Sequence, residues 1–246
     1  MADLREETVK TKLRNIITKA EGAREAELKA IREELMSVIE QVGARKFVDS
    51  TAELLDEEFK IEGCNDPRVP LKKIFNISLK ELEEILDGKE YSLNSDQPIL
   101  DLLGEHKKDV QLIKSLKESF SRNEDEVIEK IKEYYKRVDN HILKEEEALF
   151  PRLEEKGMDE HPENLREEHQ EFRAKLVNYV ELLQASGDGF EEAKDGFINN
   201  FIPAMANHMF RESFIFYPAT LEFISDDQEW TKIKRSFRAI DDLGSG

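Results

Sequence analysis

Two segments of the chain carry the same arrangement of histidine, glutamate and proline. Residues 140–151 read NHILKEEEALFP, and residues 207–218 read NHMFRESFIFYP in the same register. Each segment places a histidine four residues before a glutamate, so that both side chains lie on one face of a helix. His141 with Glu145, and His208 with Glu212, can therefore address a single dinuclear metal centre.

Four of the chain's 5 histidines fall one to each of four long predicted helices. These helices cover about residues 96–120, 125–155, 162–185 and 190–224, and they contain, in that order, His106, His141, His169 and His208. Long helices joined by short loops predict an all-α fold, an up-down-up-down four-helix bundle. Apolar residues flank each histidine at helical spacing, so all four histidines are expected to face the interior.

The charge of the two glutamates bears on the choice between a metal site and ordinary packing. A single histidine on an apolar helix face is often a core residue, and a metal-free bundle is the alternative interpretation. However, a carboxylate inside a bundle costs several kcal/mol unless a cation accompanies it. No lysine or arginine lies on all of these stripes, so metal ions are the expected partners of Glu145 and Glu212. The spacing by itself predicts a dinuclear site and does not name the metal.

Other polar residues near the motifs are assigned mainly structural roles. His161 precedes a proline at a predicted helix start, which is typical of a capping or surface residue, with metal ligation as the alternative. Glu146 and Glu147 are interpreted as solvated charges or as partners of the ligands. Tyr134 and Tyr179 are expected to pack in the core, although either side chain has the length to reach a metal.

The chain is expected to divide into a helical N-terminal region, residues 1–93, and a metal-binding four-helix domain, residues 94–246. Within residues 1–43, apolar residues spaced three and four apart indicate one long helix, or a helical hairpin broken at Gly22. This stripe packs on its own domain or, alternatively, forms a coiled-coil homodimer. Further short helices are expected over about 47–60, from the capping box at Ser78 to Gly88, and over about 227–240.

Composition excludes several classes of partner. The formal net charge of -18 over 246 residues argues against nucleic acid and anionic membrane surfaces, which attract lysine and arginine. Cys64 is the single cysteine, so the chain has no disulfide framework and no cysteine cluster for zinc or iron–sulfur. No apolar run approaches the roughly 18 residues of a membrane span. We therefore expect a cytoplasmic protein with a true hydrophobic core.

The order of these motifs resembles a known family. A histidine, an HxxxE followed by Phe-Pro, a further histidine and an HxxxE followed by Tyr-Pro resemble the hemerythrin-like, or HHE cation-binding, domain over about residues 95–225. The resemblance implies two iron ions in a non-haem di-iron centre, which an oxo or hydroxo group can bridge. It implies that His106 and His141 bind one iron, that His169 and His208 bind the other, and that Glu145 and Glu212 bridge both. Manganese and zinc remain alternatives for the same donor set.

One departure from the oxygen-carrying hemerythrins bears on function. Those proteins have an extra histidine one turn after the third-helix ligand, where this chain has Arg173. The reduced ligand set is similar to that of the repair-of-iron-centres proteins, and it leaves open coordination positions. The expected function is binding of a small diatomic ligand, O2 or NO, as a sensor, store or scavenger. The alternatives are a di-iron stress enzyme or iron donor, acting in peroxide or NO reduction or in iron–sulfur repair, and a metal-free phosphotransfer bundle.

Overall fold

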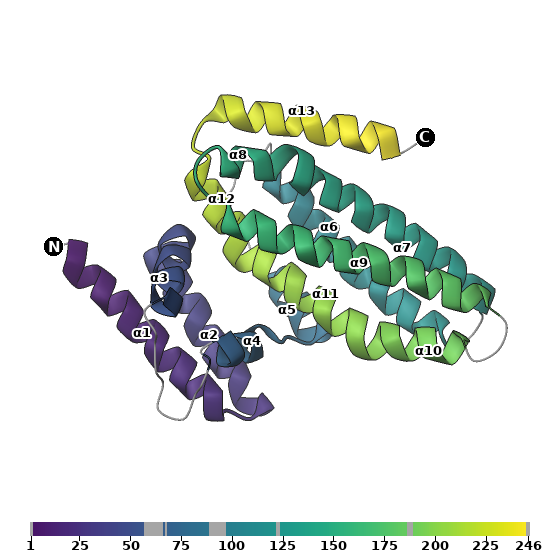
Figure 1. Ribbon diagram of the computed structural model, residues 1–246, viewed down its shortest axis with the longest axis horizontal. Coiled ribbons are helices and arrows are strands. Elements are labelled where there is room, and N and C mark those ends of the chain that lie inside the picture. Colours follow the sequence, from purple (N-terminus) through teal and green to yellow (C-terminus); the bar gives the residue numbers. More distant parts are fainter. Residues whose placement is uncertain are drawn as a thin grey trace. The chain divides into compact units, whose positions relative to one another are not determined.

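The computed structural model describes residues 2–56, 66, 68–88, 97–121, 124–185 and 189–244 (Figure 1). Over these ranges the chain is helical and contains no strand, which confirms the all-α prediction. The chain forms two compact units, one of Met1–Ile77 with Asn207–Phe223 and the other of Ser78–Ala206 with Ile224–Gly246. The boundary at Ala206 and Asn207 falls inside one continuous helix. The predicted division into residues 1–93 and 94–246 remains a prediction.

The unit that begins at Ser78 contains the predicted four-helix bundle. Its members are α6 (Ile99–Ser119), α7 (Glu124–Lys144) continued by α8 (Phe150–Glu154), α9 (Glu160–Gln184), and α10 (Gly189–Gly196) continued by the start of α11 (Ile202–Arg211). Helix α7 packs between α6 and α9, and α9 also packs against α10 (Figure 1). Two shorter helices flank the bundle: α5 (Leu79–Gly88) packs on α6, and α13 (Asp227–Gly244) packs on α7. The four-helix bundle is therefore confirmed.

An aromatic cluster lies in the core of the bundle. The Phe201 ring lies edge-on to Tyr134, Phe172 and Tyr179, with ring centroids 5.7 to 6.1 Å apart. It also stacks on Phe197 at 5.2 Å. Edge-to-face pairs stabilise a core beyond the apolar area that they bury. Tyr134 is therefore a core residue, as predicted, and Tyr179 packs against the same cluster.

The N-terminal unit is a second set of packed helices. It comprises α1 (Ala2–Gly22), α2 (Glu25–Val42), α3 (Ala44–Asp56), α4 (Arg68–Phe75), the end of α11, and α12 (Tyr217–Phe223). Helices α1 and α2 form an antiparallel hairpin whose break follows Gly22, which is the second of the two predicted alternatives. The apolar stripe of this hairpin is buried within the unit. The predicted helix over 47–60 corresponds to α3, and its last residues, like Cys64, lie outside the described ranges.

Helix α12 makes a hydrogen bond to the start of α3. The Ala44 backbone N–H donates to the Glu222 carboxylate, with 2.7 Å between nitrogen and oxygen. Gly43, with a φ of 88°, turns the chain between α2 and α3 beside this carboxylate. The Arg45 guanidinium lies 4.1 Å from the centroid of the Phe223 ring. A carboxylate at a helix N-terminus satisfies a backbone N–H that has no partner within the helix.

Three π-helical segments interrupt the described helices, and each ends just before an X-Pro pair. They are η1 (Glu145–Leu149), η2 (Phe197–Phe201) and η3 (Glu212–Phe216), followed by Pro151, Pro203 and Pro218. The residue before each proline donates its N–H to the carbonyl five residues earlier. Proline lacks an N–H and clashes with the carbonyl four residues back, and the wider turn relieves both problems. Glu145 and Glu212 each begin such a segment.

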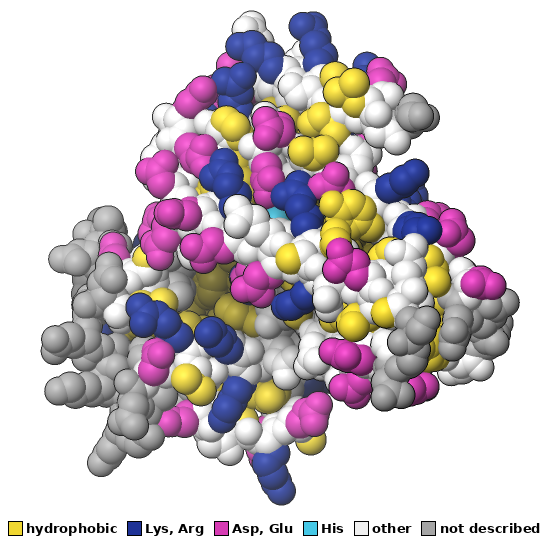
Figure 2. All heavy atoms as spheres, turned by 45° about the vertical axis from the view of Figure 1, so that its right-hand side comes forward, with side chains coloured by type: hydrophobic (Ala, Val, Ile, Leu, Met, Phe, Trp, Pro, Cys, Tyr) yellow, Lys and Arg dark blue, Asp and Glu magenta, His cyan; other side chains and the backbone are white. Residues whose placement is uncertain are grey.

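The surface carries both signs of charge. Across the face drawn in Figure 2, acidic and basic side chains are interspersed over its described part, and no extended basic area is visible there. None of the described helices is long and apolar enough to cross a membrane.

Candidate metal centre

The first two predicted ligands, His106 and His141, come from neighbouring helices. Helix α6 carries His106 and α7 carries His141, and their ring centroids are 4.8 Å apart. The Nε2 atom of His141 lies 3.8 Å from the Glu145 Oε2 atom one turn later on the same helical segment. The HxxxE spacing therefore places imidazole and carboxylate side by side, as the helical period requires.

Helix α9 brings His169 to the other side of the same carboxylate. Its Nε2 atom lies 3.3 Å from Glu145 Oε2, and its ring stacks against Phe150 with centroids 5.9 Å apart. One oxygen of Glu145 thus faces Nε2 atoms from both α7 and α9. The predicted role of Glu145 as a ligand of both metal ions remains a prediction.

The second HxxxE motif has a tighter geometry. His208 Nε2 and Glu212 Oε1 are 2.9 Å apart, at the end of α11 and the start of η3. All six predicted ligands are buried, with exposed fractions between 0% and 6%. Burial of this many titratable groups is rare in a core that has no functional use for them.

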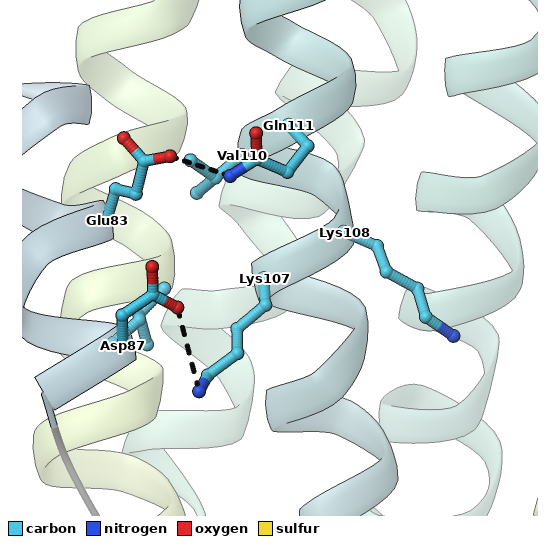
Figure 3. A pocket seen from close by; sticks show the side chains of 7 residues that line it. Glu83, Asp87, Lys107, Lys108, Val110 and Gln111 are labelled. Carbon is cyan, nitrogen blue, oxygen red and sulfur yellow. Dashed lines mark hydrogen bonds and ion pairs between the residues drawn. The ribbon is translucent and has the colours of Figure 1, made fainter.

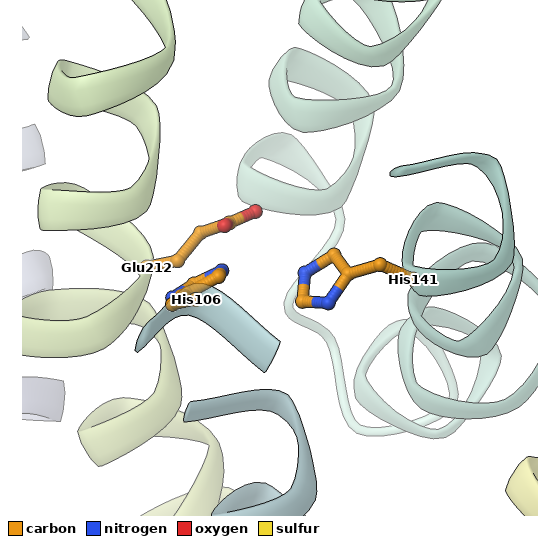
Figure 4. Close-up of side chains that lie close together, drawn as sticks. All are labelled: His106, His141 and Glu212. Carbon is orange, nitrogen blue, oxygen red and sulfur yellow. The ribbon is translucent and has the colours of Figure 1, made fainter. Parts of the chain in front are cut away.

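Five of the six predicted ligands gather in two groups, the first of which is drawn in Figure 4, and Glu145 belongs to neither group. His106, His141 and Glu212 form one group, and His169, His208 and Glu212 form the other, each with its ligand atoms within 4.8 Å of one another. Figure 4 shows the two imidazole rings of the first group directed toward the Glu212 carboxylate. Glu212 is common to both groups. The histidines divide into the same pairs that the family resemblance implies, while the ligand assignment itself remains a prediction.

The donor set matches the chemistry of a transition-metal pair. Four imidazole nitrogens and two carboxylate oxygens suit first-row metals, whereas calcium and magnesium take oxygen ligands almost alone. The two anionic side chains also offset half of the charge that two divalent ions would bring. The residues therefore fit two metal ions, and iron, manganese and zinc can each bind such a mixed imidazole and carboxylate set.

A carboxylate outside the predicted set accepts a hydrogen bond from His141. The Nδ1 atom of His141 lies 2.8 Å from Glu105 Oε2, and the Lys144 ammonium donates to Glu105 Oε1 at 2.5 Å. Burial raises the pKa of Glu105, but its bonds with His141 and Lys144 outweigh burial and lower the pKa to about 2. Glu105 precedes His106 directly, so helical periodicity gave no reason to select it.

A matching arrangement holds His169. Its Nδ1 atom lies 2.9 Å from Glu146 Oε1, and Arg173 donates to both Glu146 oxygens at 3.1 and 3.3 Å. The Arg173 Nε atom also donates to Asp139 at 2.7 Å. Burial raises the pKa of Glu146, but the bonds from His169 and Arg173 outweigh it, so the pKa lies below its usual value. Glu146 is therefore a partner of the predicted ligand His169, and this corresponds to the second of the two roles considered for it.

Arg173 occupies the position at which the oxygen-carrying hemerythrins have an additional histidine. Its guanidinium is committed to the Glu146 and Asp139 carboxylates, and it offers no lone pair to a metal. The two candidate groups do not contain His161, which is partly exposed at the start of α9.

A partly buried ion pair lies next to the site on α6 and α7. Asp109, one turn after His106, accepts from Arg137 at 2.9 and 3.1 Å. Burial raises the pKa of Asp109, and this outweighs the lowering effect of His141 and Arg137. Burial, with the nearby Asp109, also raises the pKa of the Tyr134 hydroxyl, so this phenol stays neutral.

The surface cavity between α5 and α6 is separate from this chemistry (Figure 3). It has a volume of about 230 Å³ and is lined by Glu83, Leu86, Asp87, Lys107, Lys108, Val110 and Gln111. Four of its charged and polar residues pair with one another, Gln111 with Glu83 at 2.7 Å and Lys107 with Asp87 at 3.8 Å. None of the six predicted metal ligands lines it.

Comparison with known families agrees with this geometry. The family model of the hemerythrin HHE cation-binding domain matches residues 80–220, more than half of the chain. The chain therefore belongs to the hemerythrin HHE family, which confirms the predicted resemblance. The match covers α5 and the bundle, and it excludes both the N-terminal helices α1–α4 and the closing helix α13. No curated protein and no solved structure matches the chain.

Proposed function

We propose that the protein is a cytoplasmic non-haem di-iron protein that binds a small diatomic ligand, O2 or NO, as a sensor, store or scavenger. The observation that carries this proposal is the pair of buried ligand groups that share Glu212. A shared carboxylate holds two ions close enough to act on one exogenous molecule. Membership of a cation-binding family supports the same reading.

Charge balance supports metal occupancy. Glu145 and Glu212 are fully buried, and each ionised carboxylate in a core costs several kcal/mol unless a cation accompanies it. The nearby basic side chains Lys144 and Arg173 are engaged with Glu105 and Glu146. Two divalent ions held by the four imidazoles would more than offset the charge of the two ligand carboxylates.

The number of side-chain ligands leaves space for an exogenous ligand. Six protein side chains shared between two ions do not complete two six-coordinate shells, and Arg173 adds no ligand. Iron in such an environment supplies reversible binding of diatomic molecules. All six predicted metal-binding side chains are buried, and apolar rings such as Phe150 lie beside them. An exogenous molecule must therefore be small to reach the metal ions.

The test is titration of the ferrous protein with NO and with O2 under anaerobic control, followed by absorption spectroscopy. Saturable binding that is lost in Glu212→Ala and retained in Glu147→Ala is expected. Glu147 is the matched control because it lies on the same helical turn as Glu145 but is exposed. Absence of any spectral change in the iron-loaded wild type would overturn the proposal. Sustained peroxide or NO turnover, or iron release to an acceptor protein, would replace it with the enzyme or iron-donor reading.

A further inference from the structure

Two chains of alternating charge lead away from the predicted ligands. On one side, His141 bonds to Glu105, Glu105 to Lys144, and Lys144 to Asp241. On the other side, His169 bonds to Glu146, which pairs with Arg173 and then Asp139. Each chain has the order imidazole, glutamate, cation, aspartate. The second chain lies wholly within residues of the matched domain, whereas the first ends on helix α13, outside it.

Helix α13 is closely joined to the first chain. The Asp241 carboxylate accepts from Lys144 Nζ at 2.6 Å and from Asn140 Nδ2 at 2.9 Å. Lys144 is itself buried, and its ammonium lies 5.9 Å from the centroid of the Phe237 ring, also on α13. A buried ammonium fixed by two carboxylates has little freedom, so this contact differs from an exposed ion pair.

We propose that Asp241 is a positioning residue for the metal-binding histidine His141, acting through Lys144 and Glu105. This inference rests on the proposed metal site. Asp241 holds the Lys144 ammonium in place, and Lys144 orients one oxygen of Glu105 so that the other accepts from His141 Nδ1. That hydrogen bond fixes the ring orientation and directs Nε2 toward the metal, as outer hydrogen bonds do for metal-bound imidazoles.

The position of Glu105 explains why Asp241 is needed to hold Lys144 in place. Its two oxygens are divided between His141 and Lys144, at 2.8 and 2.5 Å. Without Asp241, Glu105 would be the remaining carboxylate partner of Lys144 in this series of interactions. The Lys144 side chain could then shift and draw the Glu105 carboxylate away from His141. The closing helix would then contribute to one ligand group, that of His106 and His141, and not to that of His169.

The test measures Co²⁺ binding to metal-free protein, because Co²⁺ reports ligand geometry through its visible bands. Loss of a side chain that hydrogen-bonds directly to a metal ligand weakens metal binding by about 10–100-fold. Asp241 is two polar contacts further from His141 than Glu105 is, so Asp241→Ala is expected to weaken Co²⁺ binding by about threefold to tenfold. It should also alter the visible bands and the exchangeable imidazole N–H signal of one histidine in the proton NMR spectrum of the Co²⁺ protein. Asp241→Glu should recover part of each effect.

Two control variants separate positioning from general destabilisation. Asp242→Ala removes the same charge from the next residue of α13, which is exposed, and should leave Co²⁺ binding and spectra unchanged. Asp139→Ala, at the end of the other chain, should shift a different histidine N–H signal. Wild-type affinity and spectra in Asp241→Ala would overturn the inference while leaving the metal site intact. Failure of the wild type to bind Co²⁺ would overturn the inference together with the proposed function.

Discussion

Replacing Glu212 with glutamine separates the role of this carboxylate in metal binding from its role in folding. Glutamine keeps the volume of the buried side chain and retains a carbonyl oxygen that can accept from His208. We therefore expect the unfolding free energy of metal-free Glu212→Gln to stay within about 1 kcal/mol of the wild-type value. The metal-loaded protein should respond differently, because Glu212 belongs to both ligand groups.

The size of that response follows from linkage. A ligand present at 1,000 times its dissociation constant stabilises the native state by about 4.1 kcal/mol per site. Even outer partners of metal ligands change affinity by about 10–100-fold, so loss of a direct anionic ligand should reduce the gain by at least ~1.4 kcal/mol per site. Over two sites this corresponds to roughly 3 kcal/mol or more, a loss of about 6–12 °C in the metal-dependent rise of the melting temperature.

The assay is thermal unfolding with and without Fe²⁺ under anaerobic conditions, with Glu147→Gln as the matched control. The control should keep the full metal-dependent rise because its side chain is exposed. A full rise in Glu212→Gln would refute the view that this carboxylate serves both ions. An equal loss in both variants would refute the ligand assignment.

Three further predictions concern stability in the metal-free protein. The pKa of Glu105 is lowered from 4.5 to about 2. Its ionised form therefore contributes on the order of 3 kcal/mol to the free energy of unfolding above pH 4.5, and this contribution is lost as the pH falls toward 2. In urea unfolding, the unfolding free energies of the wild type and Glu105→Gln should therefore converge as the pH falls over this window. A difference that stays constant with pH would contradict the lowered pKa of Glu105. Phe201→Ala should cost about 3–5 kcal/mol in the same assay, because the ring packs against four aromatic neighbours, and a cost below about 1 kcal/mol would contradict its place in the core. Glu222→Ala removes the acceptor of the Ala44 N–H and should cost about 1–2 kcal/mol by thermal unfolding, whereas an unchanged melting temperature would show that this bond is not needed.

Helical periodicity was sufficient to predict which histidines face the interior. His106, His141, His169 and His208 all lie on apolar stripes, and the structure buries each of them. The reason is that burial of a helix face is set largely by its own sequence, through the 3.6-residue period. The same principle left two alternatives for residues 1–43, one long helix or a hairpin broken at Gly22, and the structure shows the hairpin.

The partners of the ligands could not be predicted in this way. Glu105 adjoins His106 in sequence and faces α7, so its role depends on how two helices are placed against each other. Asp241 is far from Lys144 along the chain, and no local pattern links them. The π-helical turns at Glu145 and Glu212 have only the following prolines as a local signal, and proline by itself also permits a kink or a helix end.

Metal content provides the most direct test of the dinuclear centre. Protein purified without chelator would be subjected to elemental analysis, with absorption spectra recorded in air and after dithionite. We predict about two iron ions per chain, one for each ligand group, with near-ultraviolet charge-transfer bands that bleach on reduction. Metal-free protein that cannot be reconstituted with ferrous iron would contradict the account and would leave the duplicated HxxxE motif as core packing.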